Sequence, residues 1–149
     1  MIVGFVFLFA LNSFYSYAAD KEPTDIIDTK AEIWELQMTG QTKGTLKMVL
    51  KPVQTEKDIC SIAGEFSGRI RDHLGGIGKV RCKLKGKIEK DSFLADFTGP
   101  ADMRMCNVVV RGTMRGTVSK SQGSGTYRLR HARGSSSGKW TIKKIRTSQ

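Results

Sequence analysis

The sequence contains few of the side chains that usually carry enzyme chemistry or bind metal ions. Among its 149 residues are two histidines, His73 and His131, and neither stands at motif spacing from a partner. The sequence has no H-E-x-x-H motif, and its three cysteines form no C-x-x-C pair. We therefore expect a protein that is not an enzyme and that holds no cofactor and no metal.

Long apolar runs are also absent, apart from residues 2–11. That run is too short to cross a bilayer, which needs about 20 apolar residues. Because small residues follow it, the run is typical of a secretory signal peptide. We expect residues 1–18 to be a signal peptide, residues 19–30 a flexible leader, and residues 31–149 a single domain. This domain would be secreted or periplasmic, with no transmembrane span after cleavage; an uncleaved N-terminal anchor is the alternative.

Acidic residues are scarce relative to basic ones. The chain has 14 Asp and Glu against 25 Lys and Arg, which gives a formal net charge of +11 at pH 7. Such a positive field favours association with polyanions, for example nucleic acid, anionic lipid or acidic polysaccharide. A solvated basic surface that only keeps the protein soluble is the alternative.

Convincing helical periodicity is absent, and side chains instead alternate with a period of two along most of the chain. Between residues 79 and 89 every odd position is charged and every even position is uncharged, which is the pattern of a half-buried strand. The same alternation predicts about eight strands, and the short links between them favour antiparallel pairing of neighbours. Burying all the apolar faces together favours an all-β, up-and-down antiparallel meander that forms a closed or nearly closed β-barrel. A two-sheet β-sandwich is the alternative.

Turns are expected where glycine, proline or small polar residues cluster between the alternating segments. These clusters lie at residues 40–43, 52, 75–78, 90–91, 99–100, 119–124 and 134–138.

A repeated triplet of glycine, threonine and an apolar residue occurs three times between residues 112 and 127. Within each triplet the glycine and the apolar residue share a parity, so the glycine faces the interior of the predicted barrel. A missing side chain there lets the strand bend or lets another side chain fill the space. The side chains that we expect in the interior include Trp34, Phe66, Leu84, Val110, Tyr127 and Trp140.

The three cysteines, Cys60, Cys82 and Cys106, all have the inward parity. A disulfide between Cys82 and Cys106 needs Cα atoms within about 7 Å of each other. One strand lies between these two positions, and we expect them at a similar height, about 9.6 Å apart unless curvature or a bulge closes the gap. Buried free thiols that act as small apolar fillers are the alternative.

Basic side chains occupy the outward parity and form the candidate polyanion-binding site. The candidates are Arg69, Arg71, Arg81, Lys83, Lys85, Lys87, Arg128 and Arg130, and a second basic patch is expected from Arg111, Arg115, Arg128, Arg130, Lys139 and Lys143. Because the aromatic residues have the buried parity, the outer face offers no platform for base stacking, and we expect no sequence-specific binding of nucleic acid.

These patterns together favour a non-catalytic β-barrel binding protein. Its ligand would be either a small apolar molecule inside the barrel or an anionic envelope component on the basic outer face: an anionic lipid, a polysaccharide or a protein partner. The alternative is a protein–protein interaction, inhibitor or structural assembly protein of the cell envelope. The sequence leaves open which ligand it is, whether the barrel has a cavity, and which oligomer forms.

Overall fold

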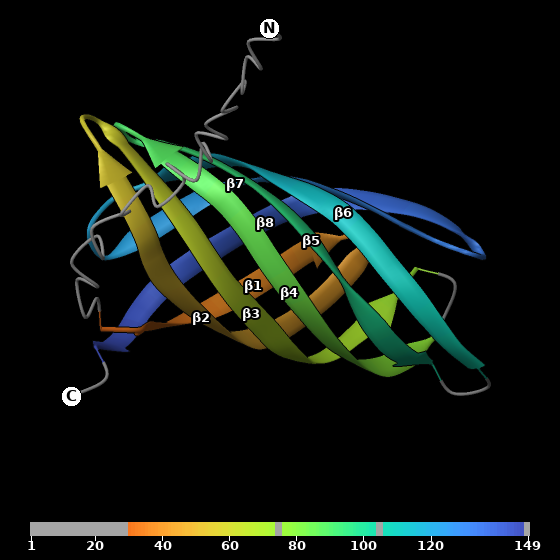
Figure 1. Ribbon diagram of the computed structural model, residues 1–149. Helices are drawn as coiled ribbons and strands as arrows, with labels where there is room; N and C mark the ends of the chain where they lie inside the picture. Colours follow the sequence, from red (N-terminus) through yellow and green to blue (C-terminus); the bar gives the residue numbers. More distant parts are fainter. Residues whose placement is uncertain (1–29, 74–75, 104–105, 148–149) are drawn as a thin grey trace, which may run out of the picture.

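The computed structural model describes residues 30–73, 76–103 and 106–147, and these residues form eight β-strands. The strands are β1 (Glu32–Gly40), β2 (Thr42–Glu56), β3 (Ile59–Asp72), β4 (Ile77–Glu89), β5 (Ser92–Met103), β6 (Cys106–Val118), β7 (Gln122–His131) and β8 (Gly134–Thr147). Each strand pairs antiparallel with the next, and β8 pairs with β1, so the sheet closes into a barrel (Figure 1). The predicted closed meander is therefore confirmed, and the alternative of two separate sheets is wrong.

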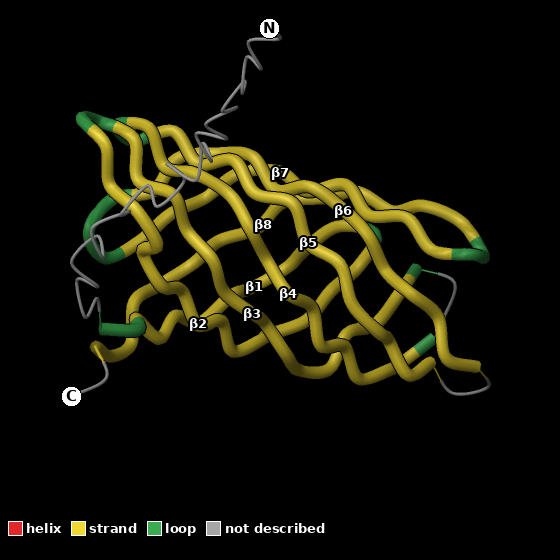
Figure 2. The backbone as a smooth tube through the Cα atoms, in the orientation of Figure 1, coloured by secondary structure: helices red, strands yellow, loops and turns green. Residues whose placement is uncertain are grey.

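The expected signal peptide, residues 1–18, and all of the expected leader except Lys30 lie outside the described residues. The part of the chain that is described contains no helix long and apolar enough to cross a membrane. Figure 2 shows that strands make up nearly all of this backbone and that the links between them are short.

Several predicted turns are instead parts of strands. Pro52 lies within β2, next to a register shift, and residues 99–100 lie within β5. The glycine–serine stretch at residues 134–138, which we expected to be a loop, begins β8, and the turn before it contains only residues 132–133. The small residues extend the pairing because glycine allows neighbouring backbones and side chains to approach closely.

The inward parity of all eight strands forms one apolar core. Trp34, Phe66, Leu84, Val110, Tyr127 and Trp140 all lie in it, each at most 4% exposed. Two voids described inside this core each have a volume of about 10 Å³, at or below the size that holds one water molecule. Side chains therefore fill the described interior.

Inward-facing glycines make room for large rings in this core. Gly116 pairs with Gly125, and this pair lies between Phe93 on β5 and Trp140 on β8. The two rings meet above the glycines with their centroids 5.2 Å apart. A tilted arrangement at this separation is favourable for aromatic pairs. The triplets found in the sequence thus place glycine where the interior holds its largest side chains.

Gly112 serves the same purpose for a second ring pair. It lies opposite Phe97, and a Cβ added at Gly112 would overlap the Phe97 ring. Phe97 in turn packs edge-on against Phe66, with ring centroids 5.2 Å apart. A side chain at this position would displace a ring that a neighbouring strand holds in place.

We predict that Gly125→Ala destabilises the barrel by about 1–3 kcal/mol, the usual effect of overpacking a filled core. The added methyl group would overlap the carbonyl oxygen of Arg115, which is backbone and cannot rotate away. Denaturant unfolding followed by tryptophan fluorescence measures the change. Ser124→Ala, at the adjacent exposed position, should change the unfolding free energy by less than about 0.5 kcal/mol. Equal losses in both variants would show that the ring packing does not require this glycine.

Candidate functional site

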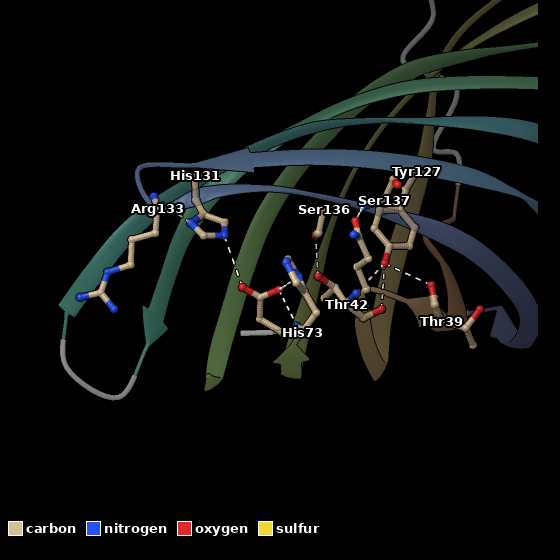
Figure 3. Close-up of polar contacts among 10 residues, drawn as sticks. Thr39, Thr42, His73, Tyr127, His131, Arg133, Ser136 and Ser137 are labelled. Carbon is tan, nitrogen blue, oxygen red and sulfur yellow. Dashed lines mark hydrogen bonds and ion pairs between the residues drawn. The ribbon is translucent and has the colours of Figure 1, made fainter. Parts of the chain in front are cut away.

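Two histidines meet one buried carboxylate at an end of the barrel. The Asp72 side chain is 5% exposed and accepts a hydrogen bond from the backbone N–H of His73 at 2.7 Å. The Nδ1 atom of His73 lies 2.7 Å from the same carboxylate oxygen, and Nε2 of His131 lies 3.5 Å from the other one. Figure 3 shows both imidazole rings pointing toward this carboxylate, one from the end of β3 and the other from the end of β7.

Ser136 lies in the same region, at the centre of residues 134–138. We expected these residues to form a turn and overlooked their Gly-x-Ser-x-Gly spacing. In hydrolases this spacing forms a sharp turn between a strand and a helix, which exposes the serine. Here the stretch belongs to a strand, and Ser136 is buried with its hydroxyl 2.7 Å from that of Thr42 (Figure 3).

The arrangement of His131 does not suit it to activate a serine. Its Nδ1 atom accepts the backbone N–H of Arg133 at 3.2 Å, while its Nε2 atom faces Asp72. Nucleophilic catalysis needs a base hydrogen-bonded to the nucleophile, and no hydrogen bond joins His131 to Ser136 within the described chain. The cluster instead ties the end of β3 to the end of β7.

A tyrosine hydroxyl fastens the link between β1 and β2 in a similar way. The hydroxyl of Tyr127 accepts the N–H of Thr42 at 3.0 Å and lies 2.8 Å from the carbonyl oxygen of Thr42 and 3.1 Å from that of Thr39. Burial raises the pKa of this phenol; the hydrogen bonds to Thr42 act in the opposite direction, and the negative charge of Asp72 raises it further. The phenol therefore stays protonated and acts as a structural cross-link.

Neither of these clusters supplies a metal site. Among the residues that the structure describes, no group of three or more histidine, cysteine, aspartate or glutamate side chains could hold a metal ion. Every buried side-chain nitrogen and oxygen atom of the described residues has a hydrogen-bond partner.

The three cysteines are free thiols, so the disulfide between Cys82 and Cys106 that the sequence allowed is not formed. Cys106 begins β6 and is level with Met103 on β5 and Gly78 on β4. Cys82 lies four residues farther along β4, about 14 Å at the rise of a strand, and this offset adds to the two strand spacings between the cysteines. The expectation that the two cysteines lie at a similar height is wrong, because Cys106 is the first residue of β6 whereas Cys82 is the sixth residue of β4.

Basic side chains from three strands surround a groove on the outer face of the barrel. Its volume is about 860 Å³, and it is lined by Lys83, Lys85, Asp96, Phe97, Thr98, Arg111, Gly112, Thr113, Arg128 and Arg130. The outward-facing members form two rows across β4, β5, β6 and β7: Lys83–Thr98–Arg111–Arg130 and Lys85–Asp96–Thr113–Arg128. We call this region the basic groove.

The rows explain why the surface is hollowed. Lys83 and Lys85 form one bank on β4, and the three arginines form the other bank on β6 and β7. Between the banks lie the shorter side chains of Asp96, Thr98 and Thr113. At a strand spacing of about 4.8 Å, Lys83 and Arg111 are about 9.6 Å apart across the floor.

The five cations of the groove have no salt bridges within the described part of the chain. Arg111 lies directly opposite Arg130, and like charges in this position repel each other. The lining of the groove contains a single carboxylate, that of Asp96, and Glu65 on β3 is the register partner of Lys83 on the other side. The groove therefore concentrates positive charge that a negatively charged ligand would neutralise.

The structure divides the sequence candidates into two groups. Lys83, Lys85, Arg128 and Arg130 line the basic groove, together with Arg111 from the second predicted patch. The remaining candidates, Arg69, Arg71, Arg81 and Lys87, are exposed on β3 and β4 but do not line it. Of these, Arg81 lies 3.5 Å from Glu65, and Lys87 lies 3.8 Å from Glu89.

A second groove, of about 750 Å³, lies over β1, β6, β7 and β8. Its charged side chains are Glu35, Asp91 and Lys143, so it does not share the positive character of the basic groove.

Comparison of the chain with protein-family models, curated proteins and solved structures gives no match.

We predict that Asp72→Asn lowers the free energy of unfolding by about 1.5–3 kcal/mol, the usual contribution of hydrogen bonds to a charged group. The two rings face different oxygens of Asp72, and the amide keeps only one accepting oxygen, so it would present N–H groups to one of the two histidine rings where the carboxylate now accepts. Thermal unfolding measures the change, with Asp102→Asn at an exposed position of β5 as the matched control. Equal melting temperatures for the two variants would show that this carboxylate does not hold the strand ends together.

We predict a loss of stability in alkali that depends on Cys82. Burial raises the pKa of its thiol from 9.0 to about 12. Between these values the folded protein keeps a proton that the unfolded chain releases, so the unfolding free energy falls by about 1.4 kcal/mol per pH unit. Denaturant unfolding at pH 8.5 to 10.5 should show a shallower decline for Cys82→Ala than for the native chain. Parallel declines would contradict the prediction.

Proposed function

We propose that this protein is a non-catalytic binding protein that takes an anionic ligand in the basic groove. The observation that carries the proposal is the set of five cations, drawn from three strands, that line one concavity and have no salt bridges within the described chain. Charges of one sign in a cleft raise the local concentration of an oppositely charged ligand.

The filled interior favours the outer face over the barrel core as the binding site. Pockets for small ligands usually have volumes of about 300–1,000 Å³, whereas the two voids described in the core are each about 10 Å³. The two outer grooves, of about 750 and 860 Å³, have the size of a ligand site. We therefore place the ligand outside the barrel.

The polar cluster at the end of the barrel supports a role other than catalysis. Its serine and its histidine are each engaged with other partners, and the carboxylate is buried between two imidazoles. With the N-terminal sequence favouring export, we propose that the ligand is an anionic component of the cell envelope or of its surroundings, in keeping with a secreted or periplasmic location.

We predict that reversing both charges on the β4 bank, Lys83→Glu with Lys85→Glu, weakens binding to immobilised heparin by about tenfold or more. The salt dependence should also become shallower, by about one unit of slope for each cation that no longer pairs with an anionic group of heparin. Binding at several salt concentrations measures both effects.

The matched control is Lys47→Glu with Lys51→Glu. These two exposed lysines of β2 give the same change in net charge away from the groove. The control should retain most of the affinity of the native chain. Equal weakening by both pairs would contradict the proposal, because it would assign the binding to net charge and not to the groove.

A further inference from the structure

A carboxylate lies in the floor of the basic groove. Asp96 is exposed on β5, between its register partners Lys85 on β4 and Thr113 on β6. No ion pair joins it to any residue that the structure describes. A ligand that carried only negative charge would be repelled by this carboxylate. Its position therefore points to a ligand that also presents hydrogen-bond donors.

The floor is suited to a ligand rich in hydroxyl groups. An ionised carboxylate accepts hydrogen bonds with both oxygens, and each threonine hydroxyl both donates and accepts. Asp96, Thr98 and Thr113 are adjacent positions in the two rows of the groove. A ligand on this floor could thus direct hydroxyl groups downward while its charged groups reach the banks.

The banks are suited to carboxylate, sulfate or phosphate groups. The guanidinium groups of Arg111, Arg128 and Arg130 can bind such groups through two parallel hydrogen bonds, and the ammonium groups of Lys83 and Lys85 act as point charges. Successive outward residues on one strand are about 7 Å apart. Each bank therefore presents cations at two positions along the groove, where they can contact successive anionic groups of an extended ligand.

The outer face lacks the features that other polyanionic partners use. Single-stranded nucleic acids stack their bases on aromatic side chains, and the anchors of protein interfaces are enriched in tryptophan and tyrosine as well as arginine. Within the described barrel these rings are buried: Trp34, Phe66, Phe93, Phe97, Tyr127 and Trp140 are each at most 4% exposed. Phe97 is the one aromatic residue that lines the groove, and at 4% exposed it presents little ring surface for stacking. The groove thus combines charge with hydroxyl-binding groups.

We infer that the ligand of the basic groove is an acidic polysaccharide, a sugar chain that carries anionic groups and free hydroxyls. This inference rests on the proposed function and names its ligand class. The polysaccharide lies along the strands of the groove. Its anionic groups contact the two banks, and its hydroxyl groups donate hydrogen bonds to Asp96.

The test uses Asp96→Asn. Recognition by charge alone predicts that this variant binds more tightly, whereas recognition of hydroxyl groups predicts that it binds more weakly. Calorimetric titration compares polygalacturonate oligomers, which carry carboxylates and hydroxyls, with inorganic polyphosphate of matched charge, which has no sugar hydroxyls. The native chain should bind polygalacturonate more tightly than polyphosphate. Asp96→Asn should weaken polygalacturonate binding by about threefold to tenfold, because a hydrogen bond to a charged acceptor is replaced by a weaker one to a neutral amide oxygen. The same variant should strengthen polyphosphate binding.

Asp102→Asn is the matched control, since it removes an exposed carboxylate from the same strand outside the groove. It should leave the preference for polygalacturonate unchanged. Melting temperatures of both variants should match that of the native chain, because Asp96 has no ion pair in the described structure to lose.

Three results would overturn the inference. If Asp96→Asn strengthens binding to both probes, the carboxylate only reduces the charge of the groove, and the proposed function survives without the sugar ligand. Tighter binding to a single-stranded oligonucleotide or to anionic phospholipid vesicles than to polygalacturonate would assign the groove to those ligands. If none of these probes binds in a salt-dependent manner, the proposed function itself is wrong.

Discussion

The volume enclosed by a closed eight-stranded sheet is the constraint on which the rest of this structure depends. An interior of this size can be filled only if large inward side chains are matched by small ones on neighbouring strands. Here Phe93 and Trp140 lie over the paired glycines Gly116 and Gly125, and Gly112 leaves space for Phe97. The two voids described in the core are each about 10 Å³. The glycines are therefore as much a part of the core packing as the rings.

A filled interior leaves the outer face and the strand ends available for function, and these two regions differ in how their polar groups are used. Near the strand ends, Asp72 and Ser136 are buried and satisfied by partners from other strands, and the buried Tyr127 hydroxyl bonds to the link between β1 and β2. In the basic groove, five cations and one carboxylate have no ion-pair partners in the described chain. Satisfied buried groups stabilise the fold, whereas unpartnered charges in a concavity are available to a ligand.

The shape of the groove follows from side-chain length on neighbouring strands. The outward residues of β5 in the two rows are Asp96 and Thr98, which are shorter than the lysines and arginines on either side. Long side chains on β4, β6 and β7 therefore rise around a low floor. This arrangement converts a convex barrel wall into a site that can hold an extended ligand, and it places hydrogen-bonding groups at the bottom and cations at the rim.

The sequence by itself determined the strand content and the faces of the strands, because a period of two is a local property that each segment carries independently. It favoured the closed meander but left a two-sheet sandwich as the alternative. It also placed Lys83 and Lys85 on the outer face and Trp140 in the core. It did not determine the turn before β8, since residues 134–138 contain loop-forming residues that the sheet pairs with β7. Nor did the sequence show that Lys83, Arg111 and Arg130 lie in one row across the sheet, or that Cys82 and Cys106 lie at different heights in the barrel. Those relations depend on the register between strands and on closure of the barrel, which are set by hydrogen bonds and packing between segments far apart in the chain.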